Sequence, residues 1–489
     1  MTFALLLVAT PLVAALVCAA VPRRGPTLSA IACAATLALG VAVAARSFTL
    51  PAERALDGLV YLDALSGLIV LIIAMVSAIA GLYAVGYVRN AVASGEIASR
   101  QVRWFYLWLQ LSIAAMFAVP LLNNLGLMWV AVELTTMTTA LLVAFFRRGH
   151  ALEAAWKYLM LGAVGLGFAL FGLLLTYYAA GQALGEAASA LAWDQLRARA
   201  AALDPGLMRV AFALVLVGFG TKAGLAPMHT WLPDAHGQAP TPVSVLLSGA
   251  LLNCALYAVL RFHLLAVGAL GPDFSSDLLL GLGALSIVVA VPFVLVQHDL
   301  KRLLAYSSVE HMGIVALAVG IGGPLALFAA AFHMFNHAIA KTTLFVAAGA
   351  LGQGYGTLRL ARLRGAIEVA PLPALALLIG TLAITGAPPF APFASEFGIA
   401  LAGFAGRPRA IAGAVVLIAG SVLIFGGMLY HVLQVTMRAA PARVRPASFP
   451  FAAAFVGLPL GTLLVMGIWL PPALRDAFSA AAGVLGHAP

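Results

Sequence analysis

Long apolar runs, separated by short polar connectors, dominate the sequence. A helix that crosses the hydrocarbon core of a bilayer needs about 20 mostly apolar residues. Fourteen runs meet this need, near Thr2–Val21, Leu28–Ala45, Leu65–Tyr87, Trp104–Pro120, Leu125–Phe146, Ala155–Ala179, Leu207–Pro227, Val243–Leu265, Leu278–Val296, Leu303–Gly320, Leu325–Leu351, Leu372–Ala402, Ala410–Val435 and Phe449–Leu470. The pattern therefore predicts an all-α polytopic membrane protein with about 14 transmembrane helices.

Two of these runs contain glycine and proline at membrane depth. The first break, Gly224–Pro227, follows Lys222, and the second, Gly386–Pro392, precedes Glu396. Proline removes a backbone donor and clashes with the preceding turn, so both runs predict broken helices. Unwound backbone is tolerated at this depth only where it is buried in protein or lines a cavity.

The two breaks divide the chain into related halves. Interrupted spans at matching places point to inverted repeats with an ion site near the midplane. We expect two five-helix repeats at 101–270 and 271–437, preceded by three helices at 1–100 and followed by a last helix at 438–489. Five crossings leave the chain on the opposite side, so the repeats must be inverted. The connector Gly181–Gly206 predicts a short surface helix.

Composition supports a bilayer as the solvent. The chain is 63% hydrophobic and 9% charged, with a mean hydropathy of +1.05, whereas soluble domains carry roughly 25% charged residues. The three cysteines lie far apart in apolar runs, without the spacing of disulfide, zinc or iron–sulfur motifs. The sequence also has no haem motif and no Rossmann fingerprint, so we expect no cofactor or resident metal.

The net charge of +10 reflects membrane topology rather than nucleic-acid binding, because basic residues lie singly or in pairs between apolar runs. Counted with the connector that each adjoins, sixteen lysines and arginines belong to odd-numbered connectors and nine, Arg261 among them, to even-numbered connectors and the tail. The other two, Lys222 and Lys341, lie farther inside spans. The positive-inside rule then puts odd connectors in the cytoplasm and both termini in the periplasm of a bacterial inner membrane. The first run lacks the basic start and cleavage site of a signal peptide.

Charged residues inside spans are the first functional candidates, because each costs roughly 2.5–3.5 kcal/mol on insertion scales. Glu133 lies eight residues into its span, and Lys222 lies beside the first break. Two structural alternatives remain open. Glu133 can serve packing through hydrogen bonds to nearby threonines, and the Lys222 side chain can extend to the cytoplasmic interface.

A second candidate group is His333, His337 and Lys341, spaced four residues apart on one helix face. Histidine titrates near neutral pH and exchanges protons through two nitrogens, so a proton relay fits this row. Two histidines at this spacing can also bind zinc, although the Lys341 cation opposes it, and both histidines can be purely structural. Glu310 and His311 can extend the row.

These motifs resemble the antiporter-like, proton-translocating membrane proteins shared by respiratory complex I, Mrp antiporters and membrane-bound hydrogenases. The resemblance covers roughly residues 100–435 and is carried by Gly220–His236, Pro240–Ser244, Asp299–Ser308, His333–Lys341 and Gly386–Glu396. The segments Thr230–His236 and Leu251–Tyr257 are most similar to the F component of hydrogenase-4.

The resemblance implies fourteen helices and a chain of charges across the membrane centre. It assigns Glu133 and Lys222 to the charge pair of the first half-channel and Glu396 to the end of the second. The row His333, His337 and Lys341 would connect them. This chain departs from many relatives in the eighth span, where Asn253 and Ser248 replace a titratable lysine or histidine.

We therefore expect a proton-translocating subunit of a redox-driven membrane complex of hydrogenase-4, formate hydrogenlyase or NADH-quinone oxidoreductase type. Moving one charge against 100 mV needs roughly 2.3 kcal/mol, which partner redox subunits must supply. A Mrp-type Na⁺/H⁺ antiporter subunit and a structural scaffold remain alternatives. His229 and His236 are expected to shape the cytoplasmic mouth.

Overall fold

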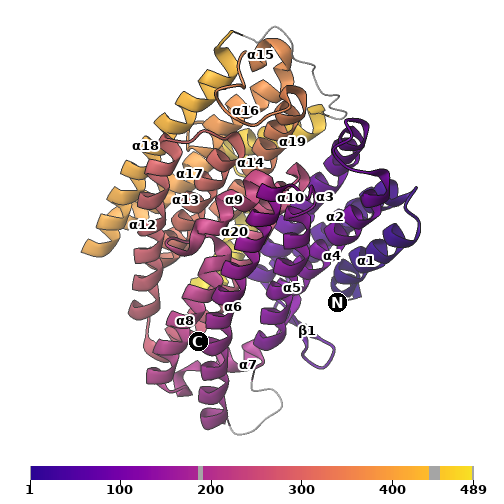
Figure 1. Ribbon diagram of the computed structural model, residues 1–489. Coiled ribbons are helices and arrows are strands. Elements are labelled where there is room, and N and C mark those ends of the chain that lie inside the picture. The colour runs from indigo at the N-terminus through magenta and orange to yellow at the C-terminus, as the bar shows by residue number, and fades with distance from the viewer. Residues whose placement is uncertain (1, 185–190, 440–451, 487–489) are drawn as a thin grey trace.

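Helices form nearly the whole protein (Figure 1). The computed structural model describes residues 2–184, 191–439 and 452–486. Its main elements are α1 (Thr2–Ala20), α2 (Gly25–Thr49), β1 (Glu53–Ala55), β2 (Val60–Leu62), α3 (Ala64–Ala93), α4 (Val102–Leu121), α5 (Leu125–Val143), α6 (Gly149–Leu184), α7 (Trp193–Ala198), α8 (Pro205–Ala223), α9 (Trp231–Gln238), α10 (Thr241–Leu246), α11 (Leu252–Leu270), α12 (Asp273–Leu295), α13 (Leu300–Ile321), α14 (Gly323–Tyr355), α15 (Ala366–Val369), α16 (Pro371–Ile384), α17 (Ala391–Phe404), α18 (Pro408–Met437), α19 (Ala452–Ile468) and α20 (Pro472–Gly486).

The all-α polytopic membrane fold is confirmed, but the predicted count of fourteen spans is not. Within the described residues, eleven helices are long and apolar enough to cross a membrane, or twelve if the bent pair α19 and α20 counts as one span. Polar side chains lower the hydropathy of α14, although it is 33 residues long. The twelfth predicted span is two short apolar helices, α16 and α17. Fourteen crossings remain a prediction, and Phe449, where the last was expected to begin, lies outside the described residues.

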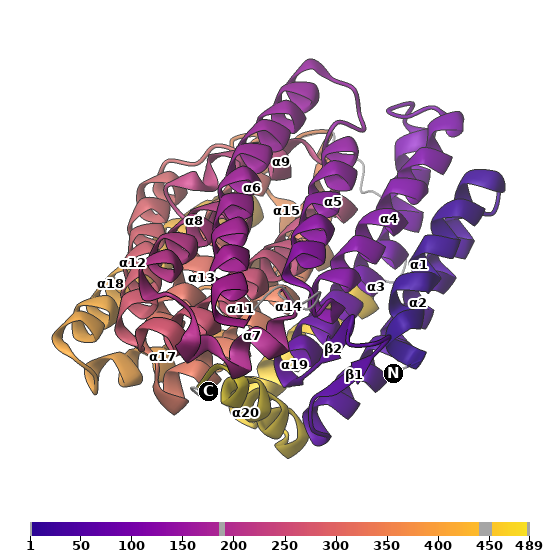
Figure 2. The same cartoon turned by 90° about the horizontal axis from the view of Figure 1, so that it is seen from below.

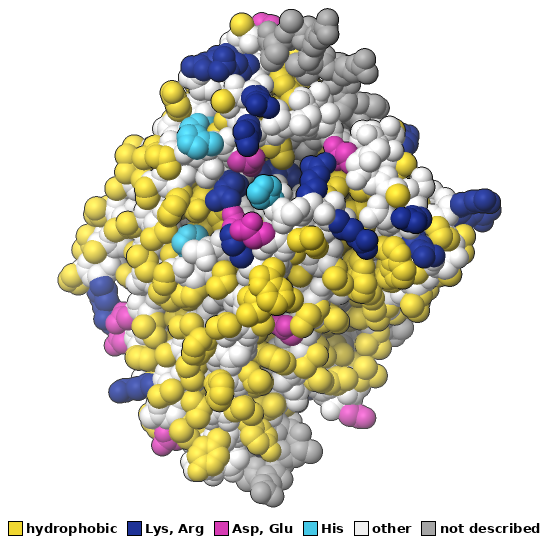
Figure 3. Space-filling model, viewed as in Figure 1, with side chains coloured by type: hydrophobic (Ala, Val, Ile, Leu, Met, Phe, Trp, Pro, Cys, Tyr) yellow, Lys and Arg dark blue, Asp and Glu magenta, His cyan; other side chains and the backbone are white. Residues whose placement is uncertain are grey.

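Alternate connections meet at opposite ends of the bundle. At one end a β-bridge joins Val60 to Leu122, another joins Asn124 to Ala192, and Arg197 donates to the carbonyl of Val484 on α20. At the other end Asp299 bridges to Arg359. Figure 3 shows most visible Lys and Arg side chains on its upper half, the end that carries α15. This grouping agrees with helices that cross alternately up and down.

Both predicted helix breaks are present. Helix α8 stops at Gly224, whose φ of +79° suits glycine, and α9 begins seven residues later. Helix α16 ends at Ile384, and Gly386 has a φ of +72° before α17 begins at Ala391. A Cβ atom on Gly386 would lie 2.6 Å from the Glu396 carboxylate. Glycine therefore lets this carboxylate approach the unwound segment.

Helix α14 lies in the middle of the bundle. It packs against α13, α16 and α17 and against α3 and α10, which lie earlier in the chain. The predicted surface helix in the Gly181–Gly206 connector is α7, although α6 extends further than expected. Helix α20 turns by 81° from α19 and packs on α14 and α3 (Figure 2). Every side chain of α14 from Ala329 to Leu351 is buried, so its polar groups face protein.

One buried ion pair corrects the topology count. Arg261 was assigned to a connector, but it lies inside α11 and is 2% exposed. Its two terminal nitrogens each donate to Asp63, at 2.7 Å, and the guanidinium stacks 4.0 Å from the Trp193 ring centroid. Asp63 caps α3 by accepting from the Ser66 amide. The pair fixes α11 against α3 and is not a topology signal.

Candidate functional site

Lys222 is buried in the last turn of α8, directly before the first helix break. Its Nζ donates to Thr136 Oγ1 of α5 at 2.7 Å and to the hydroxyl of Tyr158 on α6. The ammonium also lies 4.5 Å from the Tyr158 ring centroid. Trp231 stacks on the Tyr158 ring as well, with ring centroids 4.5 Å apart. The lysine is thus enclosed in protein and does not extend to the interface.

Glu133 lies one turn before Thr136 on α5 and is partly buried. Its Oε2 has no hydrogen-bond partner among the described residues. Within the same part of the chain, the hydrogen bonds of Lys222 go to Thr136 and Tyr158 and not to Glu133. Thr136 joins Lys222 to the helical turn that carries Glu133, so the two charges face one polar neighbourhood without touching.

Neutral groups occupy the join between the two halves. A π-helical turn at Leu247–Leu251 separates α10 from α11. Within it, the Ser248 hydroxyl lies 2.9 Å from the Ser308 hydroxyl of α13. Asn253 donates to the Gly249 carbonyl at 2.9 Å, and its side-chain oxygen has no partner in the described chain. A hydroxyl both donates and accepts hydrogen bonds, so the two serines can continue a hydrogen-bonded chain without titrating.

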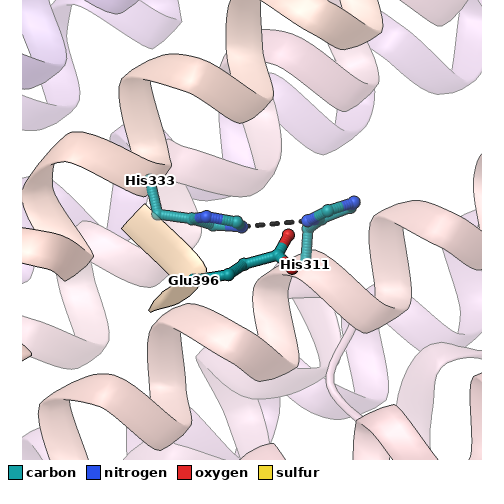
Figure 4. A group of neighbouring side chains, drawn as sticks. All are labelled: His311, His333 and Glu396. Atoms are coloured by element: carbon teal, nitrogen blue, oxygen red, sulfur yellow. Dashed lines mark hydrogen bonds between the residues drawn. The ribbon is translucent and has the colours of Figure 1, made fainter. Parts of the chain in front are cut away.

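Three helices bring a second cluster together around His333. His311 Nδ1 of α13 lies 2.9 Å from His333 Nε2 of α14, and His333 Nδ1 lies 2.9 Å from the Ser395 hydroxyl of α17. Glu396 follows Ser395, and its carboxylate points toward the two imidazoles (Figure 4). One ligand atom from each of His311, His333 and Glu396 lies within 4.8 Å of the others. This arrangement suits proton exchange and also has the spacing of a metal site.

The rest of the predicted row lies along the α13–α14 interface. The His337 ring centroid is 5.4 Å from that of His311, and neither His337 nitrogen has a hydrogen-bond partner within the ranges that the structure describes. Lys341 Nζ donates to the Leu304 carbonyl of α13 at 2.8 Å. Because His333, His337 and Lys341 all contact α13, the predicted common face is confirmed.

Two further buried polar groups lie beside this interface, and one of them lines a surface cavity. His236 is fully buried and stacks on Phe345 with ring centroids 5.0 Å apart, and no described residue bonds to either of its nitrogens. Lys301 donates to the Ala239 carbonyl at 2.8 Å and lines a cavity of about 170 Å³. His236 therefore lies deeper than the mouth to which the sequence assigned it.

Comparisons with known proteins identify the family of this chain. A family model described as "NADH:quinone oxidoreductase/Mrp antiporter, TM" matches residues 122–422, which contain all six predicted site residues. This chain belongs to that family. It is 37% identical to the hydrogenase-4 component F homolog of Methylacidiphilum infernorum over 418 residues, which are 85% of this chain and 86% of the relative.

Solved structures give the same fold for this NADH:quinone oxidoreductase/Mrp antiporter family member. A chain of the membrane-bound sulfane sulfur reductase, an archaeal respiratory membrane complex, aligns with a TM-score of 0.88 at 24% identity, covering 100% of this chain and 98% of that one. A chain of respiratory complex I from Thermus thermophilus aligns with a TM-score of 0.74 at 28% identity, covering 97% and 99%.

Sequence reasoning missed several members of these clusters. Tyr158 sits in an apolar run and reads as an ordinary core aromatic, and Lys301 reads as a connector charge. No motif singles out Ser395, although it immediately precedes Glu396. These three residues share one signal, which is their position. Each lies within a few residues of a helix break or a motif lysine, or on a helix that packs beside such a residue.

Proposed function

We propose that this chain is the proton-translocating membrane subunit of a redox-driven complex of the hydrogenase-4 or NADH-quinone oxidoreductase type. The observation that supports it most is a set of titratable side chains that are buried on α8, α13 and α14, with the partly buried Glu133 on α5 and Glu396 on α17. Burying so many ionisable groups at membrane depth is costly, so such groups mark ion and proton pathways.

The proton route that we propose has three parts, which are a first half around Lys222, a connecting row on α14 and a second half that ends at Glu396. Lys222, with Glu133 nearby, holds a proton in the first half. His333, His337 and Lys341 connect to Glu396 beside the second break. Ser248 and Ser308 join the halves through their hydroxyl pair. Glu396 lines a cavity of about 390 Å³ bounded by the broken helix and α18, which gives the second half an opening.

Partner subunits would supply the energy. The relatives are named as parts of hydrogenases and of respiratory complex I, and we propose that this chain assembles with corresponding membrane and redox subunits. The location that we propose is a bacterial inner membrane, in which the positive-inside bias puts both termini in the periplasm. A partner subunit that changes the geometry around Lys222 would then change how tightly Lys222 holds its proton.

The test uses the assembled complex in sodium-free vesicles with its electron donor. We expect redox turnover to move protons, and Glu396→Gln to lower the proton-to-electron ratio in complexes that assemble normally. Glu153→Gln is the control, because Glu153 is an exposed glutamate on α6. A ratio that is unchanged in Glu396→Gln removes Glu396 from the path. Transport that requires sodium and no redox turnover identifies an Mrp-type antiporter instead.

A further inference from the structure

We propose that the cluster of His311, His333 and Glu396 is a high-affinity site for zinc or a similar divalent transition metal, whose occupation blocks the route. Zinc prefers imidazole nitrogen and carboxylate oxygen ligands, and the three residues supply these from three different helices (Figure 4). The site is distinct from the zinc motif that the sequence offered, in which both histidines lie on α14 beside Lys341.

The geometry is close to what zinc requires. Tetrahedral coordination at bond lengths near 2.0–2.2 Å places ligand atoms about 3.4 Å apart. The three ligand atoms already lie within 4.8 Å of one another, so small side-chain rotations complete the site. On the central ring, His311 Nδ1 is the nitrogen that faces His333 Nε2, at 2.9 Å, so it is the ligand atom of that ring.

Glu310 places a second carboxylate close to the cluster, next to His311. Its Oε2 lies 3.8 Å from His311 Nε2 and accepts no hydrogen bond from the described part of the chain. Glu396 as a ligand and Glu310 as a neighbour together balance the two charges of the ion, which lowers the cost of burying it in protein. Lys341 is held by the Leu304 carbonyl on the same interface, and its cation opposes the metal.

A hydrogen bond that orients His333 and two neighbouring cavities also favour a metal site here. Ser395 holds His333 at Nδ1, so His333 Nε2 faces the cluster. Outer-shell bonds of this kind orient metal-binding histidines. The cluster lies between a cavity of about 390 Å³, which Glu396 lines, and one of about 290 Å³, which Ser395 lines.

The blocking effect rests on the proposed function, whereas binding does not. A metal ion that holds His311, His333 and Glu396 together occupies the atoms that would otherwise carry protons. Zinc binding and zinc inhibition are therefore separate measurements on the same assembled complex.

The binding experiment uses the chelator-washed complex and zinc chloride in equilibrium dialysis. We expect wild type to bind one zinc ion more per complex than His311→Gln and Glu396→Gln. His263→Gln is the matched control, because His263 is a buried histidine on α11 outside the cluster. Ser395→Ala keeps all three ligands and is expected to weaken zinc binding roughly 10- to 100-fold. This variant serves as the test if the ligand variants do not assemble.

Equal zinc binding by wild type, Ser395→Ala and both ligand variants overturns the proposal. Zinc that binds the wild-type cluster without slowing proton transport keeps the metal site but removes the cluster from the route. Impaired transport in the ligand variants with unchanged zinc binding keeps the cluster in the proton route but removes the metal site. The two ideas therefore fail by different results.

Discussion

Tyr158→Phe tests the environment of Lys222 without touching the lysine. The Tyr158 hydroxyl accepts from Lys222, and Phe retains the ring against which the ammonium lies and on which Trp231 stacks. Thr139, the other partner of that hydroxyl, still bonds to the Thr135 carbonyl at 2.6 Å. The substitution therefore removes one hydrogen bond to a charged group and leaves the Thr136 contact to the lysine in place.

The expected magnitude follows from that bond. A hydrogen bond to a charged group contributes about 1.5–3 kcal/mol net, and each 1.36 kcal/mol is a factor of ten in rate. If the step through Lys222 limits transport, Tyr158→Phe should slow proton movement about 10- to 150-fold. Electron transfer measured with the membrane uncoupled should change much less.

The assay is acidification of reconstituted vesicles during redox turnover, normalised to assembled complex. Tyr177→Phe is the matched control, because Tyr177 lies on the same helix α6 and is 51% exposed. A wild-type proton-to-electron ratio in Tyr158→Phe would refute the idea that Lys222 acts through this hydroxyl contact.

Three further predictions concern the join, the fold and the topology. Ser248→Ala removes one hydroxyl of the pair with Ser308 and should lower the proton-to-electron ratio at unchanged assembly; an unchanged ratio would show that this pair is not the link. Asp63→Asn leaves the Arg261 charge unpaired and should destabilise the solubilised protein by about 3–5 kcal/mol, seen in thermal unfolding. Adding Arg261→Leu should recover part of this loss, and equal melting temperatures for wild type and Asp63→Asn would contradict the pairing. A reporter fused after Pro489 should be active in the periplasm, since the connector charges place both termini there; a cytoplasmic signal would reverse or revise the topology.

Local sequence rules predicted much of this fold. Glycine and proline predicted the breaks after Lys222 and before Glu396, because their backbone limits do not depend on the partner helix. Helical spacing likewise predicted the common face of His333, His337 and Lys341. Both features depend on residues within a few turns of one another.

The remaining features depend on distant packing. Arg261 and Asp63 are 198 residues apart, so the sequence offered no sign that they pair. His311 and Glu396 lie on different helices whose meeting depends on how α13, α14 and α17 pack. The sequence likewise offered no sign that Thr136 and Tyr158 occupy the hydrogen-bonding positions of Lys222, and the charge pair of Lys222 with Glu133 stays a prediction.

Lys222→Arg tests the central claim most directly, because arginine keeps the charge but does not release a proton at any relevant pH. The measurement is proton transport by reconstituted vesicles per assembled complex, with Lys222→Ala measured alongside. A relay predicts that both variants accumulate normally and both fail to transport protons at the wild-type ratio. Wild-type transport by Lys222→Arg, with only Lys222→Ala destabilised, would show that the lysine is structural and would contradict the account.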